Sequence, residues 1–425
     1  MNIEELESRY MELFWRQKRS QWENYVDEAH HDLCAYDEQI FALLSPYQGT
    51  LEGGTRCEKV LNAIIDRACV DSHPRVAQLR NRLDDRDNYT CDIESIDKRD
   101  RIRFRQLLSE RMREDVLQLM RQRQCLARRL GYGSYPELVL WADELDPEPV
   151  RALLLEQMKR GLPVVTALAK SYGIKWSSWT EDLASIGNHS ASADPVRLVN
   201  LVLECLGFDR LRAAIPIVVK EQGIVGYAGV LFVPDDIRIL MRPITDLQQE
   251  LTLHHELGHA IAHALNRQQG IFKTWTSSHD EAMAVVMERI AALIALDDAQ
   301  RKAAQELWLL EDTRCATSAL FELELWDKPD KAEELYLHYY GAWDIGAPPA
   351  GVWAADSFRS VDPVYIQNYI VAARVADQTV AFLRKRFADN FTEWGSWLAE
   401  NYYADGRRRS LADKCAVVGG LMCPP

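Results

Sequence analysis

The stretch LTLHHELGHAIAH, residues 251–263, holds four of the ten histidines of this 425-residue chain, together with a glutamate. Apolar residues recur in it at three- and four-residue intervals, which predicts an α-helix with one apolar side. Thr245 or Asp246 is placed to cap the start of that helix. His255 and His259, four residues apart, then stand one above the other on the same face. We therefore expect a central helix that presents two imidazoles side by side.

His255, Glu256 and His259 together form the pattern H-E-x-x-H. Two neutral imidazoles at this spacing can share one zinc ion, and the adjacent glutamate can act as general base toward water activated by the metal. The alternative is a polar helix whose histidines hydrogen-bond their neighbours, although a buried imidazole pair would then need several partners. For His254 and His263 a core or supporting role is favoured over ligation, because two ligands already use the helix face.

A third ligand is expected downstream, in SSHDEAMAVVMERI, residues 277–290, because a catalytic zinc usually has three protein ligands. Glu281 supplies the hard carboxylate that a two-histidine site lacks, although it could instead close a helix end with Ser278. Glu288 follows two turns later and could hold a ligand histidine by its other ring nitrogen, or lie on a solvated surface. Asp280 is assigned the same supporting role. The sequence thus predicts one Zn²⁺ per chain, which manganese or cobalt could replace in a preparation.

The rest of the chain is predicted to be mainly α-helical, with a small antiparallel β-sheet next to the zinc helix. The sheet is expected within residues 215–243, where VLFV and IRILM flank PDD as a hairpin. Zinc-binding helices are expected at 246–269 and 278–297. We expect an N-terminal helical lobe at 1–150 and a catalytic lobe at 151–425, or else one continuous domain.

Composition narrows the classes of partner. The net charge of −14 argues against nucleic acid, since phosphate backbones require clustered lysine and arginine. The sequence contains no run of eighteen apolar residues, so we expect no membrane span, and its N-terminal stretch does not resemble a signal peptide. The nine scattered cysteines suit reduced thiols. We therefore expect a cytoplasmic protein with a peptide or small amide substrate; the oligomeric state is left open.

The zinc region resembles that of known metallopeptidases. DDIRILMRPITDLQQELTLHHELGHAIAH followed by HDEAMAVV is similar to the zinc and glutamate helices of the angiotensin-converting-enzyme-like dipeptidases. The spacing of Glu281 and Glu288 is similar instead to the thimet oligopeptidase and oligoendopeptidase F family, as is LARRLGYGSYPELVLWADELD at residues 126–146. The resemblance covers about two thirds of the chain in patches and places it among the gluzincins. It implies a two-lobed helical clamshell with a deep cleft.

The resemblance also implies a tyrosine pair on a late helix. DPVYIQNYIVAARVADQ, residues 362–378, supplies Tyr365 and Tyr369, which would share a helix face behind Pro363. A phenol aimed at the developing oxyanion stabilises a tetrahedral intermediate. Tyr369 is the first candidate and Tyr365 the second, with an aromatic stripe in the core as the alternative for each.

Two further substrate contacts follow from the same resemblance. The relatives hold the substrate backbone against a glycine-rich strand, for which Tyr227, Ala228 and Gly229 are the counterparts; an ordinary hairpin edge is the alternative. The relatives also carry a histidine beside the tyrosine segment, whereas this chain has none after His338. Arg359 is the nearest cationic group and could bind a carboxylate or the oxyanion, or be a surface residue.

These features predict a zinc-dependent metallopeptidase that hydrolyses small peptides. Glu256 would be the general base, and Tyr369 would stabilise the oxyanion. One alternative is a zinc-dependent amide hydrolase that acts on a small metabolite or modified peptide. Another is a non-catalytic helical binding protein with a vestigial metal site, although such a site would not need Glu256.

Overall fold

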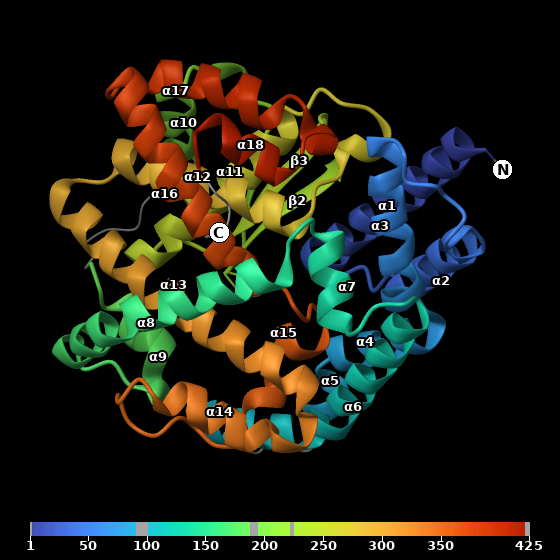
Figure 1. The fold of residues 1–425 in the computed structure, drawn as a ribbon. Coiled ribbons are helices and arrows are strands. Elements are labelled where there is room, and N and C mark those ends of the chain that lie inside the picture. The colour runs from blue at the N-terminus through green and yellow to red at the C-terminus, as the bar shows by residue number, and fades with distance from the viewer. Residues whose placement is uncertain (1, 91–100, 188–193, 222–224, 421–425) are drawn as a thin grey trace. The chain divides into compact units, whose positions relative to one another are not determined.

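The computed structural model describes residues 2–90, 101–187, 194–221 and 225–420, and these form eighteen α-helices and one three-stranded sheet (Figure 1). The predicted mainly α class is therefore confirmed. The chain divides into two compact units, one of residues 1–31, 183–309 and 368–425 and one of residues 32–182 and 310–367. Both units are assembled from separate stretches of sequence. The sequence predicted a different division, with two contiguous lobes that meet near residue 150. That division stays a prediction.

The first unit holds the sheet and the histidine-rich helix. Its helices are α1 (Ile3–Val26), α10 (Pro195–Cys205), α11 (Leu247–Ala264), α12 (Ser277–Ala295), α16 (Gln367–Phe387, from Asn368 onward), α17 (Phe391–Leu398) and α18 (Leu411–Val417). Its strands are β1 (Ile217–Val219), β2 (Gly226–Phe232) and β3 (Asp236–Met241).

The second unit contains helices and no strand among its described residues. It contains α2 (Leu33–Leu44), α3 (Arg56–Asp71), α4 (Pro74–Asp84), α5 (Asp87–Thr90), α6 (Arg101–Arg129), α7 (Tyr135–Ala142), α8 (Pro147–Tyr172), α14 (Ala332–Gly341) and α15 (Ser357–Ser360). The chain passes from one unit to the other four times: between α1 and α2, within α9 (Trp179–Ala184), within α13 (Asp298–Asp327) and at the start of α16. In the second unit, the buried Arg123 pairs with Asp71: its Nε donates to the Asp71 carboxylate at 3.1 Å, and the Tyr135 hydroxyl donates to the same carboxylate at 2.8 Å.

The sheet has the order β1-β3-β2, with β3 at its centre. β2 and β3 form the predicted hairpin and pair antiparallel, with Ala228 opposite Ile239. β1 pairs with β3 in parallel, with Ile217 opposite Ile239, so the prediction of a purely antiparallel sheet was wrong. The sheet is mixed because β1 reaches β3 through a crossover rather than through a tight turn.

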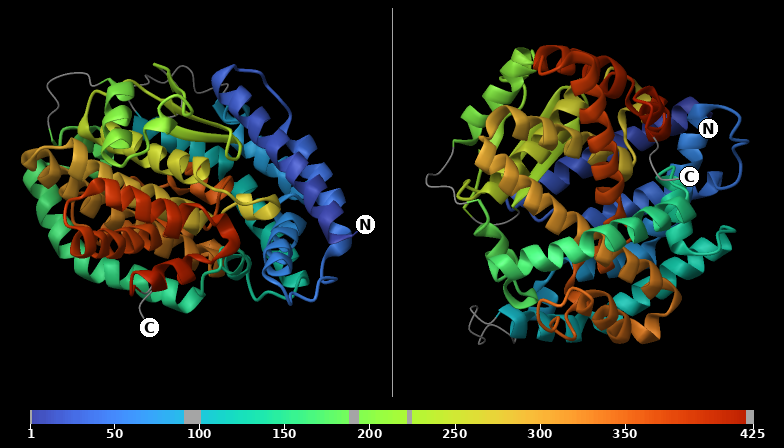
Figure 2. Two further views of the ribbon diagram at one scale, coloured as in Figure 1. Left: turned by 90° about the horizontal axis from the view of Figure 1, so that it is seen from above. Right: turned by 60° about the vertical axis from the view of Figure 1, so that its left-hand side comes forward.

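Helix α11 follows β3 directly and packs beside the hairpin, and α1 packs along β2 (Figures 1 and 2). α11 is shorter at its C-terminal end than the predicted 246–269, and α12 differs from the predicted 278–297 by one or two residues at each end. Most of α12 is buried, including an unbroken run from Ala282 to Met287. A helix that is apolar on nearly all sides belongs to a core, so the two helices meet inside the first unit.

Among the described residues, no helix combines the length and the apolar character that crossing a bilayer requires.

Candidate metal centre

Helix α11 presents the two histidines as the sequence predicted. Asp246 caps its start by accepting a hydrogen bond from the Gln249 N–H at 2.8 Å. The Thr245 N–H and hydroxyl in turn donate to Gln249 Oε1 at 2.6 and 2.9 Å. The cap fixes the register of the helix, and the His255 and His259 ring centroids lie 4.9 Å apart on one face.

Gly258 allows α12 to cross α11 at close range. A Cβ atom at Gly258 would lie 2.6 Å from Ala284 Cα and 2.8 Å from the Ala284 carbonyl oxygen. Only a residue without a side chain permits this backbone approach. The crossing directs Glu281, which is 3% exposed, toward the histidines.

His255, His259 and Glu281 offer one ligand atom each, and these atoms lie within 4.8 Å of one another. Among the described residues this is the one group of three or more histidine, cysteine or carboxylate side chains with metal-binding geometry. Thr276 caps α12, accepting a hydrogen bond from the His279 N–H at 3.2 Å, and Glu281 lies one turn inside the helix. The alternative in which Glu281 closes the helix end with Ser278 is therefore not the arrangement found.

Each histidine of the group is held by a second carboxylate. His255 Nδ1 lies 3.3 Å from Glu288 Oε2, and His259 Nδ1 lies 2.9 Å from Asp280 Oδ1. When Nδ1–H donates to a carboxylate, Nε2 keeps its lone pair and can bind a metal. The Glu288 side chain is 12% exposed, so the solvated-surface alternative for it was wrong. Two imidazoles that each contact a carboxylate through Nδ1, together with the Glu281 carboxylate, match the donor set of a catalytic zinc site.

The supporting carboxylates have partners of their own. His263 Nε2 lies 3.1 Å from Asp280 Oδ1, so one oxygen contacts two histidines. The Trp308 indole N–H donates to Glu288 Oε1. His263 thus has a supporting position outside the ligand group, as its place on the helix suggested. Trp308 was missed, because nothing in the local sequence of α13 relates it to Glu288.

The site has a strong preference for positive charge. Burial alone would lower the pKa of His255, but the Glu281 and Glu288 carboxylates outweigh it and hold that pKa well above its ordinary value. The pKa of His259 is raised in the same way, since Asp280 outweighs the effect of burial. Burial would raise the pKa of Asp280, but His259 and His263 hold it well below its usual range. Carboxylates that stabilise a protonated imidazole also stabilise a bound divalent cation.

Glu256 lies next to the ligand histidines and beside strand β2. A Cβ atom at Gly226 would lie 3.1 Å from Glu256 Cγ, so the strand passes directly against this side chain. Burial raises the pKa of the Glu256 carboxyl, against the opposing charges of His259 and His255 and a backbone hydrogen bond at Ala228. A carboxyl group with a raised pKa can both accept and return a proton near neutral pH.

The two candidate tyrosines are placed differently from each other. Tyr369 lies in α16, with its ring centroid 6.3 Å from that of His255. Tyr365 lies before the helix, because Val364 adopts a left-handed φ of 57° and α16 begins at Gln367. The expected helical pair was therefore wrong. The Tyr365 ring stacks on Phe358, at 5.7 Å between centroids and 15° between planes.

Arg359 lies in the second unit and is 2% exposed, so the surface alternative for it was wrong. Its Nη1 donates to Glu322 Oε2 at 3.2 Å, and Glu322 is equally buried. Burial raises the pKa of Glu322 to about 7, although the Arg359 charge opposes this. The guanidinium is thus bound within its own unit, and its contact with a substrate stays a prediction.

Strand β2 packs its small residues against α1. A Cβ atom at Gly229 would lie 2.1 Å from Trp22 Cε3, and the Tyr227 ring lies 6.2 Å from the ring of Trp22 and 5.4 Å from that of Tyr25. Close packing against α1 is sufficient reason for glycine at position 229. Substrate binding by Tyr227, Ala228 and Gly229 stays a prediction.

No family model matches the sequence, and no curated protein matches it. Solved structures do match the fold. PZ peptidase A, solved with an inhibitor, has a TM-score of 0.74 at 15% identity, covering 99% of this chain and 94% of that one. A protein named provisionally as oligoendopeptidase F has a TM-score of 0.68 at 16% identity, covering 95% and 82%. The M32 carboxypeptidase from Deinococcus radiodurans R1 has a TM-score of 0.67 at 14% identity, covering 99% and 95%. These identities establish the fold alone, and the chain therefore has the helical fold of these peptidases.

Proposed function

We propose that this protein is a zinc-dependent metallopeptidase that hydrolyses peptide bonds in small peptides. The observation that carries the proposal is the convergence of His255, His259 and Glu281 within 4.8 Å. Asp280 and Glu288 strengthen it, because they hold both imidazoles by Nδ1 and leave Nε2 for the metal. We assign these three residues as ligands of one zinc ion.

A zinc ion bound there would supply a Lewis acid that lowers the pKa of water and polarises an amide carbonyl. Glu256 has the task of a general base and accepts a proton from the attacking water. Its pKa, raised by burial, then suits it to return that proton to the leaving amine. Both transfers use one carboxyl group, which the passing strand β2 holds in place.

Tyr369 is assigned to the developing oxyanion. Its ring is adjacent to His255, so the side chain belongs to the surroundings of the metal site. A phenol hydroxyl that donates to the oxyanion favours the transition state over the ground state. Tyr365 is the second candidate for this role.

A peptide is the preferred substrate because the proteins of similar fold are named as peptidases, including a carboxypeptidase. The competing function is zinc-dependent hydrolysis of an amide in a small metabolite. It is favoured by one feature of the chain, the absence of any histidine after His338, where the related families carry one.

Metal removal and restoration test the proposal. The protein is stripped with a chelator, and cleavage of an internally quenched peptide is followed before and after one equivalent of zinc is added. We expect activity to disappear and then return with zinc. Activity that persists in the stripped protein would contradict a metal-dependent mechanism.

A further inference from the structure

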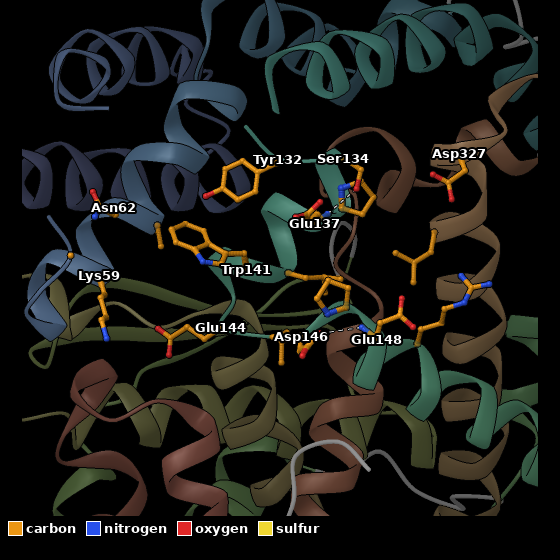
Figure 3. A pocket seen from close by; sticks show the side chains of 18 of the residues that line it. Lys59, Asn62, Tyr132, Ser134, Glu137, Trp141, Glu144, Asp146, Glu148 and Asp327 are labelled. Carbon is orange, nitrogen blue, oxygen red and sulfur yellow. Dashed lines mark hydrogen bonds between the residues drawn. The ribbon is translucent and has the colours of Figure 1, made fainter. Parts of the chain in front are cut away.

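A second site lies in the helical unit that does not contain the metal ligands. A pocket of about 1020 Å³ is lined by α3, α7, the start of α8 and the end of α13 (Figure 3). All of its lining residues belong to that unit. Its volume is at the upper end of the range of ligand pockets, roughly 300–1,000 Å³.

The pocket exposes a fixed aromatic surface. Trp141 is 42% exposed, and its ring lies against that of Tyr132, with 5.6 Å between centroids (Figure 3). The Tyr132 hydroxyl donates to Asp66 at 2.7 Å, which holds the pair in place. An exposed indole face attracts cations, and covering its apolar surface stabilises a bound ligand.

Carboxylates outnumber cations around these rings. Arg56 and Glu144 neutralise each other, because Arg56 Nη2 donates to both Glu144 oxygens at 2.8 Å. The remaining charged lining residues are four carboxylates, Glu137, Asp146, Glu148 and Asp327, and two cations, Lys59 and Arg151.

Two of these carboxylates are available to a ligand. Within the described part of the chain, the carboxylates of Glu148 and Asp327 make no hydrogen bond or ion pair. Figure 3 shows both at the end of the pocket opposite Lys59. The pocket therefore combines a rigid indole face with an excess of negative charge, which is complementary to an organic cation.

We propose that this pocket is a binding site for a basic side chain, arginine or lysine, of a peptide. The cationic group lies on the Trp141 ring and is attracted by the net negative charge of the lining residues. The site takes no part in the hydrolysis proposed above and does not depend on it.

The test is calorimetric titration of the zinc-loaded Glu256→Gln protein, which should not consume the probe, with acetyl-Arg-Arg-amide. Acetyl-citrullinyl-citrulline-amide serves as the neutral probe of the same shape, and acetyl-Glu-Glu-amide as the acidic one. We expect the arginine probe to bind most tightly and its affinity to fall with added salt. Equal binding of the citrulline probe, tighter binding of the glutamate probe, or no binding of any probe would overturn the proposal.

Variants locate the binding. Trp141→Leu should weaken the arginine probe by roughly two- to fivefold, the range for an exposed cation–π contact. Tyr172→Leu removes an equally exposed aromatic residue, at 43%, outside the pocket and should have no effect. Glu148→Gln with Asp327→Asn should weaken binding, and Lys59→Gln should strengthen it. An affinity that none of the pocket variants changes would place the probe elsewhere and overturn the proposal.

Discussion

Asp280 contacts both His259 and His263 through one carboxylate oxygen, and of these two histidines only His259 is a proposed metal ligand. Asp280→Asn keeps the shape of this side chain and removes its charge. We expect zinc affinity to fall by about 10- to 100-fold, because the ligand imidazole loses basicity and orientation. Competition with a chromophoric chelator measures this change. Asp298→Asn, at a 97% exposed side chain on α13, is the matched control and should bind zinc like the parent. Equal affinity of the two variants would argue against the role of Asp280.

Tyr369 is the residue where catalysis and metal binding can be separated. Tyr369→Phe should lower kcat by roughly 100-fold, the effect of losing one oxyanion donor, and leave zinc affinity unchanged. Steady-state kinetics on a peptide substrate and a zinc titration measure the two quantities. Tyr365→Phe is the comparison, and a large loss in that variant with none at Tyr369 would transfer the role to Tyr365.

Lys414 is fully buried, where its ammonium donates to Asp405 at 2.6 Å and to the Gly406 carbonyl at 2.9 Å. Burial lowers its pKa to about 8, against the Asp405 charge, from 10.5 in the unfolded chain. Between these two pH values the unfolded state holds a proton that the folded state has released. The Lys414 contribution to the free energy of unfolding therefore rises with pH across this window, by up to about 3 kcal/mol.

Urea unfolding at pH 8 and pH 10.5 checks this sign. The difference in unfolding free energy between the parent and Lys414→Met should shift in favour of the parent at the higher pH. Lys302→Met, at an exposed lysine on α13, should show no such shift. A fall in the unfolding free energy of the parent relative to Lys414→Met as the pH rises would contradict the lowered pKa.

At the scale of elements, the crossing of α11 and α12 at Gly258 determines whether Glu281 reaches the histidines. Gly258→Ala places a methyl group against the Ala284 backbone, which cannot yield as a flexible side chain would. We expect a loss of about 1–3 kcal/mol in unfolding free energy from overpacking, and weaker zinc binding as the helices separate. Thermal unfolding and chelator competition measure both.

The control for this substitution is Gly341→Ala at the end of α14, where a Cβ atom would have no neighbour within 4 Å. It should leave both quantities close to those of the parent. Unchanged stability and zinc affinity in Gly258→Ala would show that the crossing tolerates a side chain.

The elements also show how far local sequence determines structure. Helical periodicity is local, so the sequence spacing correctly predicted which residues share a helix face. This holds for His255 with His259 and for Glu281 with Glu288. Tyr365 was misplaced because Pro363 favours a helix start, while Val364 adopts a left-handed conformation that a β-branched residue rarely takes. The parallel pairing of β1 with β3 was missed, since a crossover leaves no turn signal in the sequence.

At the scale of the whole molecule, each compact unit combines distant parts of the chain. The Trp22 ring of α1 packs on Gly229 of β2, and the Trp308 indole N–H donates a hydrogen bond to Glu288. No sequence pattern links the two residues of either pair. Such contacts depend on tertiary packing and could not be predicted from periodicity. The convergence of His255, His259 and Glu281 could be predicted, because they lie on two successive helices and follow a recognisable sequence pattern.

The most direct test of the account is mass-spectrometric cleavage profiling of a mixed peptide library. The zinc-loaded parent is compared with Glu256→Gln, and both are first shown to hold one equivalent of zinc. The account predicts cuts by the parent that disappear in the variant, with positions that define the cleavage class. If neither protein cuts any peptide while both hold zinc, the peptidase assignment is wrong and the metabolite amide hydrolase takes its place.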